Sequence, residues 1–242
     1  MAHHYKSKKG FTLAEVLITL GIIGIVAALT LPSLVSNYRK KVTAAKLKQT
    51  YSILSNAIYM QQTLSGIPFS FYYALEYRKD VCPTGYEFTS CSNALFEDYL
   101  KDNLSENTII RKEGFLAEFY PDSPSWNYGK AFILSNGVGV NIYNGCLAII
   151  PNYHPPKKVH VKRNNLVIGK DVFWFNSSAG TLYELKDYSG LMPMRKSTRS
   201  KLTREDLITR CKSTNMDTAL VACTQLFIED GFEFKKDYPI RF

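Results

Sequence analysis

Apolar residues are unevenly distributed along the chain, and the longest apolar run lies close to its start. No residue is charged from Val16 to Val35. A helix needs about 20 apolar residues to cross a hydrocarbon layer of roughly 30 Å. We therefore predict a membrane-spanning helix in this part of the sequence.

An amphipathic pattern follows the apolar run. One face of the predicted helix carries apolar residues at spacings of four, three and four: Leu47, Tyr51, Leu54 and Ile58. Gly66 and Pro68 then end the pattern, because neither residue continues a helix well. We predict that residues 36–66 are an amphipathic continuation of the spanning helix.

The remainder of the chain consists of short alternating or apolar segments separated by Gly, Asn and Pro. Asn136-Gly137 is a favoured pair for a tight hairpin turn. Thr203 is a suitable cap for a helix ending near Lys212, and a further helix is predicted at 219–228. Predicted strands cover residues 131–134, 138–143, 158–162, 171–175 and 181–185. We expect an α+β fold in which an antiparallel sheet of about four strands packs against the amphipathic half of the long helix, with additional short helices.

Basic residues give the chain a formal net charge of +9. The positive-inside rule does not orient the span, because three basic residues lie on each side of it: Lys6, Lys8 and Lys9 before, and Arg39, Lys40 and Lys41 after. With Lys46 and Lys48, the second group is close to the membrane, and anionic lipid is its simplest partner. A separate basic segment is a candidate contact for nucleic acid: Arg195, Lys196, Arg199 and Lys201.

A secretory signal peptide also places basic residues before an apolar run. Three features count against that interpretation. The run is long for a signal peptide, no convincing small-residue cleavage site follows it, and Glu15 lies near its beginning. A carboxylate at this position requires neutralisation or a partner, because lipid solvates charge poorly.

The sequence from Lys8 to Pro32 resembles the prepilin-type signature of type IV pilins and type II secretion pseudopilins. The match is carried by Lys8-Lys-Gly-Phe-Thr-Leu-Ala-Glu15 and the apolar run behind it. The resemblance implies that prepilin peptidase cuts after Gly10, on the cytoplasmic side, and methylates the new amine of Phe11. It also implies the organisation of the chain: a basic leader peptide at 1–10, a transmembrane and assembly helix at 11–35, its amphipathic continuation at 36–66, and an extracytoplasmic globular head at 67–242.

Two residues of the predicted span have expected roles in assembly. In a bundle of identical helices, Glu15 is expected to pair with the positive amine of Phe11 of a neighbouring subunit, which offsets the desolvation of both charges and sets the axial register. The alternative is that Glu15 reaches the head-group layer and has no specific partner. Pro32 lacks an N–H and clashes with the preceding turn, so we expect it to bend or locally unwind the helix around Ala28.

All five cysteines follow the apolar run, and the resemblance places them outside the cytoplasm, where disulfides form. Cys211 and Cys223 fall on the two neighbouring C-terminal helices, and a disulfide there is typical of pilin heads. A bond between Cys82 and Cys91 would then close a small loop and leave Cys146 as a thiol. Five cysteines permit other connectivities. Zinc is disfavoured because no pair has C-x-x-C spacing.

No pattern indicates catalysis, since the nucleophile-elbow, metalloprotease and P-loop motifs are absent. We therefore expect no enzyme activity. Residues 169–173, Gly-Lys-Asp-Val-Phe, resemble a segment near the end of pseudopilin-like heads, where a preceding acidic loop binds calcium in the major pseudopilin of type II secretion. Here the corresponding loop contains Lys162 and Arg163, whereas Ca²⁺ requires oxygen ligands. Calcium is thus disfavoured, and no cofactor is expected.

The expected function is that of a structural subunit of a type II secretion pseudopilus or type IV pilus, and the long head favours a minor subunit. Expected partners are prepilin peptidase, other pilin or pseudopilin subunits, the inner-membrane assembly platform and membrane lipid. Such a subunit is a single-pass inner-membrane protein with a cytoplasmic N-terminus and a periplasmic or extracellular head. Two alternatives stay open: a minor pilin whose basic head binds DNA or a secreted substrate, and a plain membrane-anchored exported domain.

Overall fold

The structure is a computed structural model that describes residues 10–66, 88–111, 114, 129–143, 146–154, 166–176, 192–193 and 202–242. Its helices are α1 (Leu13–Ser65), α3 (Phe88–Leu95), α5 (Arg204–Cys211) and α6 (Met216–Glu229), with a π-helical turn at Phe96–Leu100 and a 3₁₀ turn at Lys101–Asn103. Its strands are β1 (Ile109–Arg111), β2 (Ala131–Ile133), β3 (Gly139–Tyr143), β4 (Cys146–Ile150), β5 (Phe173–Asn176) and β6 (Met192–Pro193). The chain divides into two compact units: α1 up to Lys40 with Phe242, and Lys41–Arg241.

Helix α1 confirms the prediction of one long helix formed by the apolar run and the amphipathic segment. It ends at Ser65, and Gly66 adopts a φ of 68° while its N–H bonds to the carbonyl of Gln62. Only glycine takes this conformation without strain. The helix is continuous through Pro32, so local unwinding is not observed, and a bend at Pro32 stays a prediction.

The second unit contains a six-stranded antiparallel sheet in which the strands follow one another in chain order, from β1 to β6. The hairpin predicted at Asn136-Gly137 is confirmed. It joins β2 to β3, with the N–H of Leu134 bonded to the carbonyl of Val138 at 2.9 Å and Gly137 at a φ of 77°. The sheet therefore exceeds the expected four strands. Predicted strands 158–162 and 181–185 lie outside the described residues.

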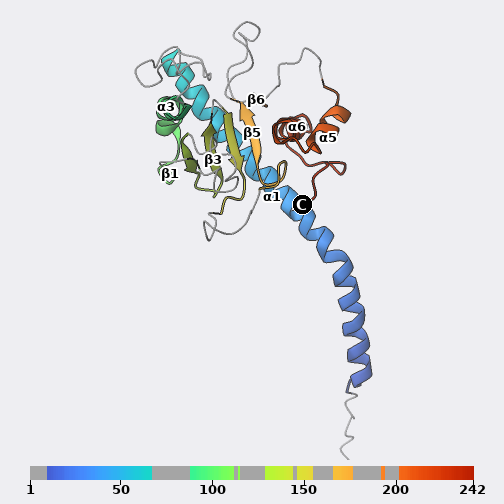
Figure 1. The fold of residues 1–242 in the computed structure, drawn as a ribbon. Helices are drawn as coiled ribbons and strands as arrows, with labels where there is room; N and C mark the ends of the chain where they lie inside the picture. Colours follow the sequence, from blue (N-terminus) through green and yellow to red (C-terminus); the bar gives the residue numbers. More distant parts are fainter. Residues whose placement is uncertain are drawn as a thin grey trace, which may run out of the picture. The chain divides into compact units, whose positions relative to one another are not determined.

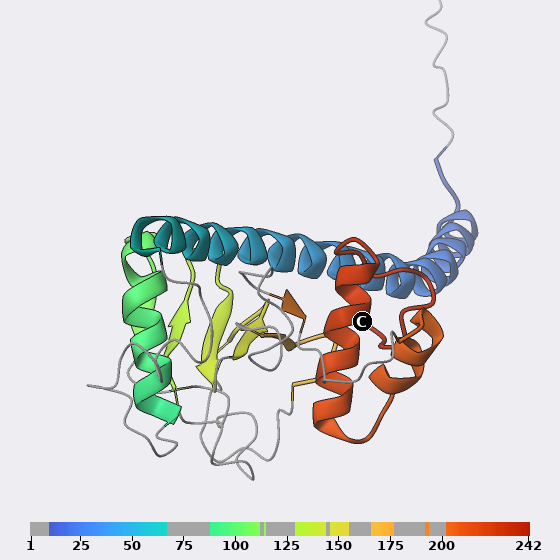
Figure 2. The ribbon, with the colours of Figure 1, turned by 90° about the horizontal axis from the view of Figure 1, so that it is seen from above.

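One side of the sheet packs against the amphipathic half of α1 and forms the main core, as predicted. Leu47, Leu54 and Ile58 of the helix are fully buried in it. Tyr51 is partly buried, with its ring 5.8 Å from that of Phe175 on β5. Figure 2 shows this part of α1 lying across the strands. The sheet contributes a set of alternate residues to this core: Phe132, Val140, Ile142, Leu147, Ile149, Phe173 and Phe175.

The intervening residues of the same strands form a second buried cluster on the opposite face of the sheet. It includes Ala148 and Ile150 of β4, Trp174 of β5 and Leu220 of α6. Strand β4 is consequently buried along its whole length. In Figure 1, α3 lies beside the β1 end of the sheet, and α5 and α6 lie beyond the β5 end.

Candidate processing and assembly site

The first turn of α1 is closed by two side chains. The Oγ1 of Thr12 accepts a hydrogen bond from the backbone N–H of Glu15 at 3.2 Å. Oε2 of Glu15 accepts in return from the backbone N–H and the hydroxyl of Thr12, each at 2.8 Å. This reciprocal arrangement is a capping box, which satisfies N–H groups that a helix start leaves unpaired. The sequence prediction missed Thr12, although Thr-x-x-Glu before an apolar run is a signature of a helix start.

The capping box uses only part of the Glu15 carboxylate. Among the described residues, Oε1 of Glu15 has no hydrogen-bond partner. A negative charge in the first helical turn is stabilised by the helix dipole, but a carboxylate within the span still needs a cation. The geometry therefore leaves one oxygen of Glu15 available for a positive group from outside the chain.

The peptide bond between Gly10 and Phe11 lies in non-helical backbone ahead of α1. Phe11 is 90% exposed, and a Cβ added at Gly10 would meet nothing within 4 Å. Exposed, irregular backbone is where proteases act most readily. The predicted cleavage point is thus open to an enzyme, whereas leader residues 1–9 lie outside the described residues.

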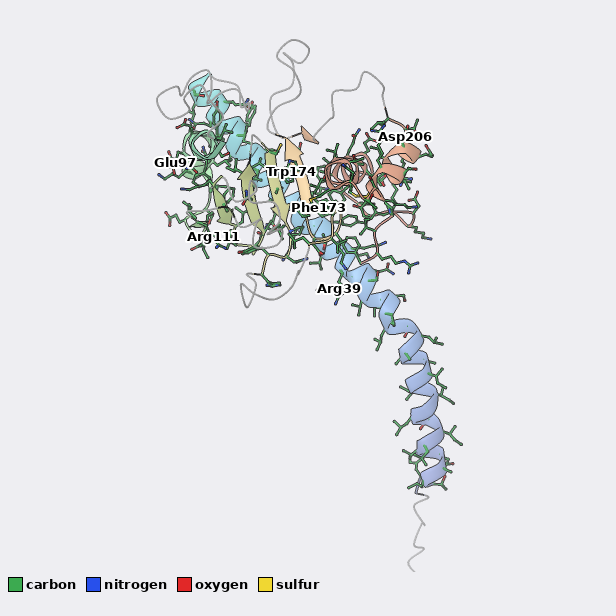
Figure 3. The ribbon with its side chains drawn as sticks, viewed as in Figure 1. Arg39, Glu97, Arg111, Phe173, Trp174 and Asp206 are labelled. Atoms are coloured by element: carbon green, nitrogen blue, oxygen red, sulfur yellow. A yellow bond between two sulfur atoms is a disulfide. The ribbon has the colours of Figure 1, made fainter. Side chains whose placement is uncertain are left out.

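The apolar half of α1 is exposed on all sides. None of its most apolar window is buried, and in the part of the chain that the structure describes it is the helix long and apolar enough to cross a membrane. Figure 3 shows its side chains projecting outward around the helix axis. An apolar surface of this extent requires lipid or other apolar helices as cover. The largest exposed side chains include Leu17, Ile18, Ile22, Ile23, Ile25, Leu29 and Leu34.

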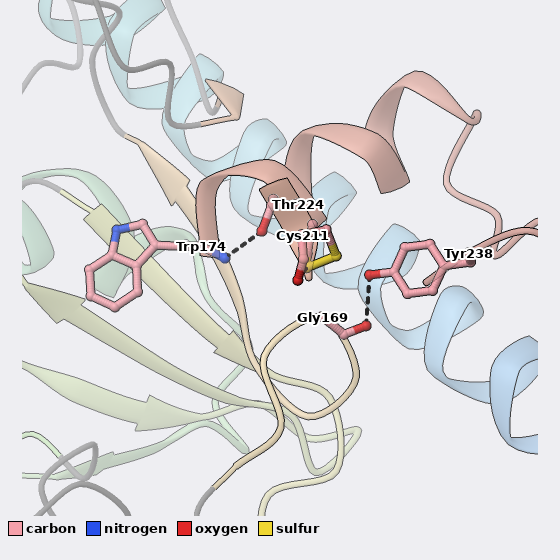
Figure 4. Close-up of a disulfide and its surroundings, with 6 residues drawn as sticks. Gly169, Trp174, Cys211, Thr224 and Tyr238 are labelled. Carbon is pink, nitrogen blue, oxygen red and sulfur yellow. Dashed lines mark hydrogen bonds between the residues drawn. A yellow bond between two sulfur atoms is a disulfide. The ribbon is translucent and has the colours of Figure 1, made fainter. Parts of the chain in front are cut away.

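In the head, the Gly-Lys-Asp-Val-Phe segment packs closely against α6 and the residues that follow it (Figure 4). Gly169 has a φ of 78°, and its carbonyl accepts a hydrogen bond of 2.7 Å from the Tyr238 hydroxyl. A Cβ at Gly169 would lie 2.8 Å from Sγ of Cys223. Two further hydrogen bonds hold the segment, from the N–H of Val167 to Asp171 and from the N–H of Trp174 to Thr224. The segment therefore has a packing role in this head.

The disulfide predicted between Cys211 and Cys223 is present and joins α5 to α6, with the two Cα atoms 4.7 Å apart. Cys146 is a buried thiol outside this bond, as predicted. Burial raises the pKa of Cys146 to about 11. The predicted Cys82–Cys91 bond lies outside the described side chains.

An ion-pair network fixes α5 to the chain end. The guanidinium of Arg204 bonds to both carboxylate oxygens of Asp230 at 2.9 Å and also contacts Asp237. Lys235 pairs with Asp230 at 2.8 Å, and the Asp230 side chain is only 1% exposed. Burial raises the pKa of Asp230, but the hydrogen bonds from Arg204 and Lys235 outweigh it and lower the pKa overall. Hydrogen bonding to Arg204 lowers the pKa of Asp237 as well.

These two depressed pKa values predict a pH dependence of stability. A carboxyl group whose pKa is lower in the folded state stabilises the fold above its unfolded pKa of about 4, and the contribution is lost as the pH falls. In Arg204→Gln, Asp230 stays buried with fewer partners, so its pKa rises. The Tm of full-length protein in detergent should then begin to fall at a higher pH than in wild type.

The matched control is Arg210→Gln, which removes the same charge from the same helix and leaves the contacts of Asp230 in place. Its Tm profile against pH should follow wild type. Identical profiles for Arg204→Gln and wild type would show that Asp230 does not depend on Arg204 for its ionisation.

Other predicted site residues belong to parts of the chain outside the described ranges. The basic candidates Arg195, Lys196, Arg199 and Lys201 lie outside the described residues, as do Lys162 and Arg163 of the loop compared with a calcium site. Within the described ranges, no group of three or more His, Cys, Asp or Glu residues is arranged to hold a metal ion.

Comparison with known proteins gives two family matches. Residues 5–31 match the prokaryotic N-terminal methylation motif, and this range contains the predicted cleavage point, the capping box and most of the apolar run. Residues 33–242 match a family of unknown function (DUF6613). Searches of curated proteins and of solved structures give no match. The chain thus belongs to the DUF6613 family, and its methylation motif makes it a type IV pilin-like protein.

Proposed function

We propose that this chain is a minor structural subunit of a type II secretion pseudopilus or type IV pilus. The observation that carries the proposal is the methylation motif at residues 5–31, which extends into the unburied apolar half of α1. Prepilin peptidase removes residues 1–10 and methylates the amine of Phe11. The role of the protein is structural and not catalytic.

Before assembly, the subunit is held in the inner membrane by the apolar half of α1. The N-terminus faces the cytoplasm, where the peptidase and the assembly platform act, and the head lies in the periplasm. Oxidising conditions on that side support the Cys211–Cys223 bond. Exposed apolar side chains of α1 exchange lipid for the helices of neighbouring subunits during assembly.

The start of α1 supplies the contact that sets subunit position. Thr12 holds Oε2 of Glu15, and Oε1 accepts the positive amine of Phe11 from a neighbouring subunit. Both charges are otherwise poorly solvated in the apolar bundle, so the pair forms only at one axial offset between helices. The capping box thereby orients the carboxylate for subunit contact.

Cleavage by prepilin peptidase tests the proposal. On co-expression with the peptidase, mass spectrometry should find a chain that begins at N-methylated Phe11. Gly10→Val should lower the cleaved fraction on the order of tenfold or more, because a branched side chain obstructs the extended backbone in the protease cleft. The control Gly24→Val makes the same change within the span, where a Cβ meets nothing within 4 Å, and should be cleaved normally.

A wild-type chain that keeps its first ten residues beside an active peptidase would contradict the proposal. It would leave the plain membrane-anchored exported domain as the better description. Equal cleavage of Gly10→Val and wild type would instead show that the peptidase does not require glycine at this position.

A further inference from the structure

The turn of α1 that follows the apolar run carries three consecutive basic residues, Arg39, Lys40 and Lys41, which we call the basic ring. Successive positions of a helix point about 100° apart and rise about 1.5 Å each. The three charges therefore point to three sides of the helix at nearly the same depth. A binding partner that docks from one side needs a stripe along one face, whereas charges distributed round the axis fit a planar surface that surrounds the helix.

The basic ring lies at the depth of lipid head groups. The uncharged stretch from Val16 to Val35 is about 30 Å long as a helix, which matches the hydrocarbon layer. Arg39 is four residues further on, or about 6 Å, which is within the polar layer of a bilayer. Tyr38 directly precedes the ring and is 68% exposed, and tyrosine is enriched at this level of a membrane.

The charges of the basic ring are not neutralised by the described part of the chain. Helix α1 contains no acidic residue after Glu15, and no ion pair joins the ring to a carboxylate within the described ranges. Lys40 lies 6.0 Å from the ring centroid of Phe242, a contact that retains its positive charge. Lys46 is different, since its ammonium donates a hydrogen bond to Asn152 at 3.0 Å. We predicted from the sequence that Lys46 lies near the membrane with Arg39, Lys40 and Lys41, but in the structure Lys46 contacts the head.

We propose that the basic ring binds the phosphate groups of anionic phospholipids where the span leaves the bilayer. This inference rests on the proposed function only in that α1 must cross a membrane. Lipid binding to the ring fixes the depth of the helix at the end opposite Glu15. A subunit that enters a filament gives up these lipid contacts, so the anionic lipid content of the membrane influences how readily subunits are extracted.

The test uses the full-length chain reconstituted in phosphatidylcholine bilayers that contain trace spin-labelled phosphatidylglycerol or phosphatidylcholine. The relative association constant follows from the motionally restricted fraction of each label. Wild type should prefer phosphatidylglycerol by about fivefold or more, since each basic residue near an anionic surface contributes on the order of a fivefold effect. High salt should reduce the preference. In the triple variant Arg39→Gln/Lys40→Gln/Lys41→Gln, the association constants for phosphatidylglycerol and phosphatidylcholine should become nearly equal.

The control Arg210→Gln/Lys212→Gln/Lys236→Gln removes three positive charges from the head and should keep the preference. Loss of preference in this control, or its retention in the ring variant, would overturn the proposal. Duplex DNA binding can be measured on the same chain in neutral bilayers. If DNA binding is lost only in the ring variant while the lipid preference is unchanged, the partner is nucleic acid and the lipid proposal is overturned. Cleavage after Gly10 is scored separately. Normal cleavage without lipid preference rejects the ring proposal alone, and lipid preference without cleavage rejects the proposed function alone.

Discussion

Glu15→Ala subunits should be cleaved after Gly10 like wild type but should enter filaments at least about a hundredfold less efficiently. Removing one partner of a buried charge pair costs about 3–5 kcal/mol, because the other charge is left uncompensated. Here the charge left behind is the amine of Phe11 in the adjacent subunit. The measurement is the fraction of cleaved subunit recovered in filaments after co-expression with the assembly machinery.

The capping box makes it possible to separate charge from helix capping at Glu15. Glu15→Gln keeps an oxygen that can accept from Thr12 but removes the negative charge. Thr12→Ala keeps the charge and removes the cap, at a cost of about 1 kcal/mol. If pairing between subunits is the main role, Glu15→Gln should fail like Glu15→Ala, and Thr12→Ala should assemble within about tenfold of wild type. Normal assembly of Glu15→Gln would show that the charge is not required.

Long-range periodicity made α1 predictable. An uncharged run followed by apolar residues on one face fixes both halves of the helix, and Gly66 marks its end. Two short sequence motifs also gave predictions that the structure confirms, because each depends on interactions within a few residues. Asn136-Gly137 favours a hairpin, and Thr203 forms a capping box with Asp206 at the start of α5.

Elements determined by tertiary packing were missed. Strand β4 has an uninterrupted apolar sequence, because the sheet is covered on both faces, and such a run lacks the alternation that identifies a strand. Helix α3 has the sequence Phe-Thr-Ser-Cys-Ser-Asn-Ala-Leu, in which most residues are poor helix formers, and its contacts with β3 exist only in the folded chain. The edge strands β1 and β6 have three and two residues, too few for a pattern.

The candidate site residues also differ in whether their roles depend on neighbouring residues in the sequence or on residues far away in it. The motif that defines cleavage and Glu15 is contained within one short segment, so the sequence was sufficient to identify it. The role of Gly169 depends on Cys223 and Tyr238, which are far from it in the sequence. A resemblance could single out the Gly-Lys-Asp-Val-Phe segment, but only the fold supplies a physical reason for its glycine.

That reason predicts a large loss of stability in Gly169→Ala. The new Cβ would lie 2.8 Å from Sγ of Cys223 and 2.8 Å from the Tyr238 hydroxyl, in a region where the disulfide prevents relaxation. Overpacking costs about 1–3 kcal/mol, and a positive φ in a residue other than glycine adds about 1 kcal/mol or more. We expect the free energy of unfolding to fall by about 2–4 kcal/mol, measured by denaturant titration of the full-length chain with tryptophan fluorescence.

Gly137→Ala is the matched control for this experiment. Gly137 has nearly the same φ, 77° against 78°, but a Cβ there meets nothing within 4 Å. Its cost should be limited to about 1 kcal/mol of backbone strain. The difference between the two variants therefore measures the contact of Gly169 with Cys223 and Tyr238. Equal costs would show that this contact adds nothing to stability, and that Gly169 is needed for its backbone conformation alone.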